Sequence, residues 1–459
     1  MLALIRTDKE TLMLLLAIAL PMIVSQGTYA LMIFTDRYFM SMIGTTHVAA
    51  TLGGGVAAFM CMSLFVGLLS YGNALISQAF GANKLEDCSR IVSQGFLLAL
   101  LSLPFLALGA WGVYSAFDGL GHDPQQLLLE KSYFKVLMFG GALTLFKSCL
   151  AAYFAGIGRT SVVMTADLLA VVINVPISYG LIFGAWGLPQ MDIIGAALGT
   201  VASNCFALLV FTLVYFGKEN STRFYVAASL VFDKGLFKNY FRLGFPSGLE
   251  MFLNIAAFNV FILLFQSYGV VQGAAAAIVL NWDLLSFVPM IGLHIAVISL
   301  VGRCVGAQDY QRLNSVISSG FLLGLAYSGV LATVFIVFRD SLVGVFITEA
   351  TSGEELRNLA TWMMIGMGSY VMADAVILIA SGVLRGAGDT RWLMTASTIL
   401  HWLMVVAAYL VIMVWELGPK VAWLVFVGMI LSLALCFTLR LGSSKWRQTA
   451  GHEADLIEA

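Results

Sequence analysis

Several carboxylates in this sequence stand inside long apolar runs, where a charge is costly. The clearest is Asp36, in the stretch "MIFTDRYFMS". A carboxylate at the middle of a bilayer costs about 3 kcal/mol or more, so such a residue usually faces a cavity and has a function. Helical spacing puts Ser25, Tyr29 and Met32 on the face of Asp36, which predicts a polar stripe along a cavity wall. The alternative is an interfacial Asp36 beside Arg37, although successive helical residues point about 100° apart and pair poorly.

Two further groups of polar residues follow in the first half of the chain. Asp167, Asn174 and Ser178 share one helical face, at i, i+7 and i+11. Thr200 and Asn204 form an i, i+4 pair in the next apolar run. We predict that the amides and hydroxyls among these residues bind substrate together with Asp36, Tyr29 and Met32. The alternatives are helix–helix hydrogen bonds and, for Asp167, exposure to water near the cytoplasmic end of its helix.

The second half of the chain carries its own set of intramembrane polar residues. Glu250 and Asn254 lie on one helical face, one turn apart. Asp283 stands deep in the apolar stretch "NWDLLSFVPMIG", and Tyr370 and Asp374 form an i, i+4 pair well inside another span. These residues, together with Asp36, are the predicted ion-coupling groups. Glu250 has an interfacial alternative, because its helix starts only about two turns earlier.

One lysine and two histidines complete the set of intramembrane titratable groups. Lys147 lies deep in its span, where it either neutralises a cavity acid or extends its ammonium group towards water. His294 and His401 have no second ligand at i+3 or i+4, so we expect no resident metal. The cysteines contain no Cys-x-x-Cys pair and read as small apolar residues. No cofactor is expected.

The elements that must position these residues are membrane helices. The 459-residue chain is 60% hydrophobic and 11% charged, and its mean hydropathy is +0.93. A soluble protein carries about a quarter charged residues. The ten-residue alternating segments of a β-barrel are absent from the sequence. A net charge of −1 gives no reason to expect nucleic acid as a partner. The fold class is therefore an all-α membrane protein.

Twelve transmembrane helices are predicted from the apolar runs. Lys and Arg concentrate in one set of loops and at both ends of the chain, which places both termini in the cytoplasm and makes the span number even. The predicted spans are 12–37, 48–78, 90–116, 132–156, 162–184, 193–217, 240–267, 272–300, 313–338, 358–384, 392–415 and 420–441.

The two halves of the chain resemble each other. "GANKLEDCSRIVSQGFLLAL" (81–100) aligns with "GAQDYQRLNSVISSGFLLGL" (306–325), and the same offset pairs Pro21 with Pro246. Six spans in each half insert the same way up. We therefore expect two parallel six-helix bundles, residues 1–222 and 223–459, related by a pseudo-two-fold axis along the membrane normal. Such bundles rock about a central cavity, which favours a transporter, with a channel as the alternative.

The motifs resemble those of the multidrug and toxic compound extrusion (MATE) family, NorM-like branch. "FTDRYFMSMIG" is similar to the family's Val-Asp-Thr-x-Met-x-Gly pattern, with Asp36 at its aspartate. "YFAGIGRT" and "GVLRGAGDT" are similar to its signatures after spans 4 and 10, and "MADAVILIASGVLRG" places Asp374 at the span 10 acid. The sequence departs from the family at three positions: Arg37 replaces Thr, Ser178 replaces a second Asp of some relatives, and Asn254 replaces Glu.

The resemblance implies a secondary antiporter of the inner (plasma) membrane of a bacterial or archaeal cell. It would export amphipathic organic cations in exchange for H⁺ or Na⁺ by alternating access, act as a monomer in the lipid bilayer, and hold any transported Na⁺ near Asp374. A lipid-linked precursor flippase of the same superfamily is the alternative. A membrane enzyme is not expected, because no catalytic constellation of Ser, His and Asp is evident. The loop "GANKLEDCSR" does not fit the motif of the major facilitator fold.

Overall fold

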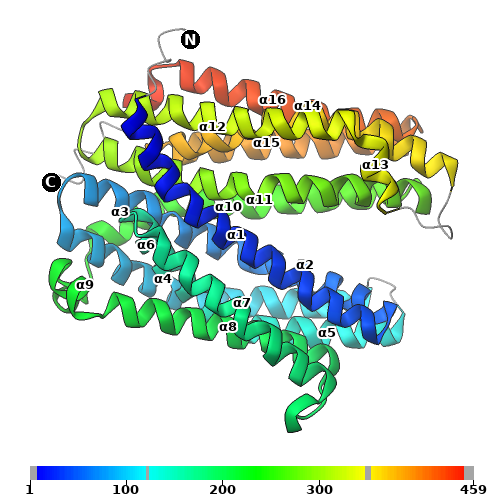
Figure 1. Cartoon of the computed structure of the whole chain (residues 1–459), viewed down its shortest axis with the longest axis horizontal. Helices are drawn as coiled ribbons and strands as arrows, with labels where there is room; N and C mark the ends of the chain where they lie inside the picture. The colour runs from blue at the N-terminus through cyan, green and yellow to red at the C-terminus, as the bar shows by residue number, and fades with distance from the viewer. Residues whose placement is uncertain (1–7, 120–122, 347–352, 449–459) are drawn as a thin grey trace. The chain divides into compact units, whose positions relative to one another are not determined.

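The computed structural model describes residues 8–119, 123–346 and 353–448, and it contains no strand within those ranges. Figure 1 labels the helices in chain order. They are α1 (Lys9–Ile43), α2 (Thr45–Ser70), α3 (Gly72–Gly81), α4 (Leu85–Ala116), α5 (Pro124–Phe139), α6 (Gly141–Gly156), α7 (Thr160–Phe183), α8 (Asp192–Tyr215), α9 (Lys218–Arg223), α10 (Lys234–Gln266), α11 (Val270–Gly306), α12 (Tyr310–Val337), α13 (Arg339–Gly344), α14 (Glu354–Gly386), α15 (Thr390–Tyr409) and α16 (Pro419–Gly442).

Twelve membrane spans are confirmed. Within the described ranges, eleven helical segments are long and apolar enough to cross a bilayer, and the pair α5 and α6, bent by 46°, forms the twelfth. The fourth span begins at Pro124 rather than at residue 132. Its start is set by Asp123, whose carboxylate accepts hydrogen bonds from the backbone N–H groups of Gln125 and Gln126 at 3.0 and 3.4 Å.

The bend between α5 and α6 falls at Gly140, where the two helices meet. A Cβ at this position would lie 2.4 Å from a methyl carbon of Val201 on α8. Only glycine therefore allows this close approach of the backbone to α8.

The chain divides into two contact units whose boundaries lie inside helices. The N unit is Leu20–Phe252, and the C unit contains the described residues up to Ala19 together with the chain from Leu253 onwards. The lobe boundary predicted at 222/223 is not where the contacts divide, and the assignment of functional lobes to 1–222 and 223–459 stays a prediction. The helix α10 is continuous across the boundary, so its first half packs within the N unit.

Glycine contacts explain why the first half of α10 belongs to the N unit. A Cβ on Gly248 would lie 2.1 Å from the carbonyl oxygen of Leu64, and one on Gly67 would lie 2.8 Å from the Cα of Gly248. The Tyr240 hydroxyl also donates a hydrogen bond to the Leu69 carbonyl at 2.6 Å. The backbones of α2 and α10 are thus nearly in contact.

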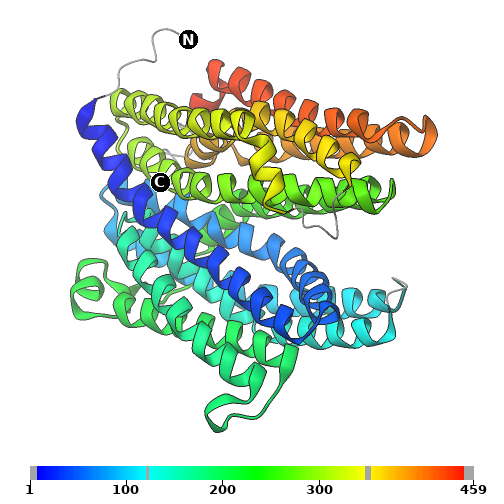
Figure 2. The ribbon, with the colours of Figure 1, turned by 45° about the vertical axis from the view of Figure 1, so that its right-hand side comes forward.

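The C unit is a bundle in which α14 is central. Figures 1 and 2 both show α12, α14, α15 and α16 running side by side. The helix α14 packs against α11, α12 and α16, and much of its length is buried. Small residues set its approach to α11: a Cβ on Gly382 would lie 3.2 Å from the His294 carbonyl oxygen, and one on Gly386 would lie 3.0 Å from that of Ile298.

Candidate functional site

In the N unit, Asp36 is buried against α8. Its side chain is 4% exposed, and the Thr200 hydroxyl donates a hydrogen bond to its Oδ2 at 2.9 Å. Its Oδ1 has no hydrogen-bond partner among the described residues. One turn away on α1, the Met32 sulfur accepts a contact from the Ser203 hydroxyl at 3.6 Å. The predicted stripe on α1 therefore faces hydroxyl groups of α8.

Two of the predicted residues on α7 lie against the same part of α8. A Cβ on Gly199 would lie 2.0 Å from the Ser178 hydroxyl oxygen, so the glycine is needed for α7 and α8 to meet here. The Ser178 hydroxyl lies beside the Asp36 carboxylate, although it makes no hydrogen bond of good geometry. Asn174 is fully buried, and neither its amide nitrogen nor its amide oxygen has a partner in the described structure. Unpaired buried groups are costly and commonly mark a functional position.

Tyr133 on α5 is a neighbour of Asp36 that the sequence analysis missed. Nothing in the local sequence marks it, because its helix is bent and its relation to α1 depends on packing. Tyr29, which was predicted, is 47% exposed and lies near Tyr133.

A second acid lies at the other end of the α1 stripe and is neutralised by a lysine. The Lys147 ammonium on α6 lies 2.9 Å from Oδ1 of Asp167 on α7. The Ser25 hydroxyl of α1 donates a hydrogen bond to Oδ2 of Asp167. The ammonium also donates to Oδ1 of Asn204 on α8 at 3.4 Å. Of the two alternatives that the sequence left open for Lys147, the structure shows the ion pair with an acid, and Asn204 is a second acceptor for its ammonium.

In the C unit, three predicted residues from two helices come together. The Tyr370 hydroxyl on α14 faces the Asp283 carboxylate on α11, and Asp283 and Asp374 are close enough for their like charges to repel. The contacts of Gly382 with His294 and of Gly386 with Ile298 set how α11 and α14 are aligned along their length. Each contact joins residues whose numbers differ by 88 (382 − 294 and 386 − 298). The same difference places Asp283 level with residue 371, between Tyr370 and Asp374.

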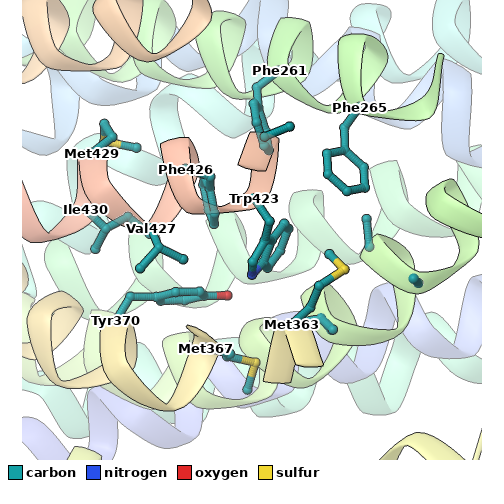
Figure 3. Packing of buried hydrophobic residues seen from close by; sticks show 14 of the residues in the cluster. Phe261, Phe265, Met363, Met367, Tyr370, Trp423, Phe426, Val427, Met429 and Ile430 are labelled. Carbon is teal, nitrogen blue, oxygen red and sulfur yellow. The ribbon is translucent and has the colours of Figure 1, made fainter. Parts of the chain in front are cut away.

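The Tyr370 ring is held by an aromatic cluster. It meets the Phe426 ring edge to face, with centroids 5.6 Å apart, and Phe426 packs on Trp423 at 5.2 Å. Figure 3 shows Tyr370 below Trp423, with its hydroxyl end towards the indole. Neither the Tyr370 hydroxyl nor the Trp423 nitrogen has a hydrogen-bond partner among the described residues. The cluster therefore fixes the ring while leaving its hydroxyl available.

The two predicted residues on α10, Asn254 and Glu250, have different surroundings. The Asn254 amide nitrogen donates a hydrogen bond to the Ser397 hydroxyl on α15 at 2.7 Å, and its Oδ1 is unpaired among the described residues. Glu250 is 4% exposed and belongs to the N unit.

No three His, Cys, Asp or Glu side chains come close enough to hold a metal ion within the described ranges. A transported ion needs a weaker and more open arrangement than a resident metal, and acid and tyrosine oxygens are ligands suited to Na⁺ or to a proton.

The fold and these buried acids define the class of the protein, which is a duplicated polytopic membrane transporter. The family model described as MatE matches residues 21–180 and 246–410, more than half of the chain. The chain therefore belongs to the MatE family, whose members are transporters and not enzymes. The second match begins 225 residues after the first, which is the offset of the internal duplication.

Relatives extend over the whole length of the chain. The multidrug resistance protein MdtK of Proteus mirabilis (strain HI4320) is 26% identical over 457 residues, covering 97% of each chain. The crystal structure of the eukaryotic MATE transporter AtDTX14 superposes with a TM-score of 0.87 at 18% identity, covering 98% of this chain and 99% of that one. A MOP superfamily transporter from Pyrococcus furiosus gives 0.85 at 16% identity, covering 99% and 100%. Likeness at this identity shows the fold.

Proposed function

We propose that this protein exports amphipathic organic cations in exchange for H⁺ or Na⁺, by alternating access across the inner membrane, with both termini in the cytoplasm. The observation that carries the proposal is the cluster of Asp283, Tyr370 and Asp374. Two carboxylates that repel each other away from water cannot both stay charged without a cation or a proton.

Competition between the coupling ion and the substrate for the same acids couples export of the substrate to entry of the ion. A cationic substrate, a sodium ion and a proton each neutralise a buried acid. If these occupancies exclude one another, entry of the ion from outside displaces the substrate outwards. The binding positions must also differ in affinity between the two states, because a ligand with equal affinity for both shifts nothing. The resemblance to a multidrug resistance protein supports drug-like molecules as the substrate class, and the acids of the membrane helices favour cations among them.

The test is ethidium flux in proteoliposomes of the purified protein, with a pH gradient imposed in one set and a sodium gradient in another. Flux under the sodium gradient alone identifies Na⁺ as the coupling ion, and flux under the pH gradient alone identifies H⁺. Absence of flux under both gradients, with correctly folded protein, would contradict the proposal.

A flippase for lipid-linked precursors is the second candidate, and it needs a cationic cavity for anionic head groups. Lys147 is the residue that favoured it, yet its ammonium is neutralised by Asp167 at 2.9 Å. No observation therefore supports the flippase over the exporter.

A further inference from the structure

We propose that Lys147 is a tethered cation that fills a second cation-binding position at Asp167, and that it thereby restricts the N unit to substrates carrying one positive charge. This inference rests on the proposed export of organic cations and names the residue that sets substrate charge. The pair of Lys147 and Asp167 has no part in the ion coupling described above.

The surroundings of Asp167 form a cation site that is already occupied. Its Oδ1 meets the Lys147 ammonium at 2.9 Å, and its Oδ2 accepts the Ser25 hydroxyl. The Asn204 amide oxygen supplies a further acceptor to the same ammonium at 3.4 Å. Two oxygens, from Asp167 on α7 and Asn204 on α8, thus converge on a position that a ligand's ammonium group could take, while the Ser25 hydroxyl of α1 holds the other carboxylate oxygen.

The position is partly open. The side chains of Lys147 and Asp167 are 20% and 16% exposed. Removing one partner of a poorly hydrated ion pair leaves an uncompensated charge, which is far less favourable than the intact pair. Loss of the Lys147 ammonium would therefore make Asp167 bind another cation.

Asp36 and Asp167 lie along the same face of α1, Asp36 as part of the helix and Asp167 as its neighbour on α7. Ser25 contacts Asp167, while Asp36 lies further along the same helix and binds Thr200. Ser25 and Asp36 are eleven positions apart, a rise of about 17 Å along the helix axis. Three helical turns bring both positions to the same face. With Lys147 in place, Asp36 is the acid of this pair that remains without a cationic partner in the described structure.

The probes are matched quinolinium compounds: a dodecyl quinolinium with one charge, a bis-quinolinium with a dodecamethylene linker, and a bis-quinolinium with an ethylene linker. Only the long dication has charges spaced to approach both acids. Equilibrium binding to purified protein in nanodiscs measures affinity without any ion gradient.

For Lys147→Met we expect the long dication to bind at least about tenfold more tightly than to the unaltered protein, because a charge pair shielded from water is stronger than an exposed one. The monocation and the short dication should gain much less. Lys147→Arg keeps the charge and should restore the original preference. The double variant Lys147→Met with Asp167→Asn removes both charges and should lose the gain.

The double variant is also the control for misfolding caused by an unpaired charge, because it contains neither charge of the pair. Equal affinities of Lys147→Met and the unaltered protein for the long dication would overturn the inference, as would a gain that persists in the double variant. If the unaltered protein binds the monocation but the gain is absent, only this inference fails. If it binds none of the three cations, the proposed function fails as well.

Discussion

The acids within the membrane helices have different partners in the N unit and in the C unit. In the N unit Asp36 and Asp167 lie at opposite ends of a stripe on α1, and Lys147 neutralises Asp167. In the C unit Asp283 and Asp374 lie together on α11 and α14, and no lysine or arginine pairs with either in the part of the chain that the structure describes. Asp283 and Asp374 therefore need a cation or a proton from solution, whereas Asp167 of the N unit has a permanent partner.

This difference indicates that the two units have different roles in transport. Repelling acids favour uptake of a small cation or a proton, because uptake removes the repulsion. A single acid that keeps one unpaired oxygen, such as Asp36, suits an organic cation that competes with that ion. The following substitutions test whether coupling resides mainly in the C unit.

The largest effect is expected for Asp374→Asn. The amide that replaces the carboxylate can neither take up a proton nor neutralise a cation, so we expect ion-driven ethidium flux to fall by about a hundredfold. Flux is measured in proteoliposomes under the gradient that drives the unaltered protein. Asp118→Asn is the matched control, because this acid is 66% exposed at a surface ion pair. Unchanged flux in Asp374→Asn would remove this acid from the coupling mechanism.

Asp36→Asn tests the N unit. We expect about tenfold weaker binding of a monocationic substrate, since a charge-assisted contact is lost while the amide keeps the shape of the side chain. Ion binding in the C unit should persist. Equilibrium binding of ethidium and ion-dependent protection from proteolysis measure the two properties separately. Loss of the ion response together with substrate binding would mean that the units do not divide these roles.

Tyr370→Phe keeps the ring against Phe426 and removes only the hydroxyl. The hydroxyl faces the Asp283 carboxylate without a hydrogen bond of good geometry, but its dipole still favours the empty, charged acid, so the coupling ion should bind about fivefold more tightly to the variant. The half-saturating ion concentration for flux reports this shift. A shift to weaker binding would show instead that the hydroxyl is a ligand of the ion. Either interpretation requires that the ring stays packed in the variant. Tyr370→Leu disrupts the aromatic cluster and shows the effect of losing that packing.

The smallest effect is expected for Thr200→Val, which preserves shape and removes the hydrogen bond to Asp36. Because the unliganded carboxylate loses its donor, organic cations should bind about threefold more tightly and leave more slowly. Thr200→Ser retains the hydroxyl and serves as the control. An identical affinity in both variants would show that Thr200 does not tune Asp36.

Much of the local structure could be predicted because it depends on short-range patterns. Apolar run lengths predicted the twelve spans, and helical periodicity predicted that Met32 and Asp36 share a face. The start of the fourth span was misplaced because the capping of α5 by Asp123 extends the helix beyond the apolar run. Because capping is a local signal, the start of this helix could have been predicted from the sequence.

The partners of the functional side chains were not predictable in the same way. Periodicity placed Lys147 and Asp283 at depth, but it gave no information on which helix each would meet. Asn254 bonds to Ser397, and Glu250 packs within the N unit, because glycine contacts such as that of Gly248 with Leu64 decide which backbones approach.

The sequence by itself determined the helices, their number and the duplication, since these follow from hydropathy and from a constant offset along the chain. Tertiary structure alone decided that Asp167 is neutralised by Lys147 while Asp283 and Asp374 meet without a cation partner in the described residues. The physical reason is that charge pairing depends on distances between helices, and close packing at scattered small residues sets those distances.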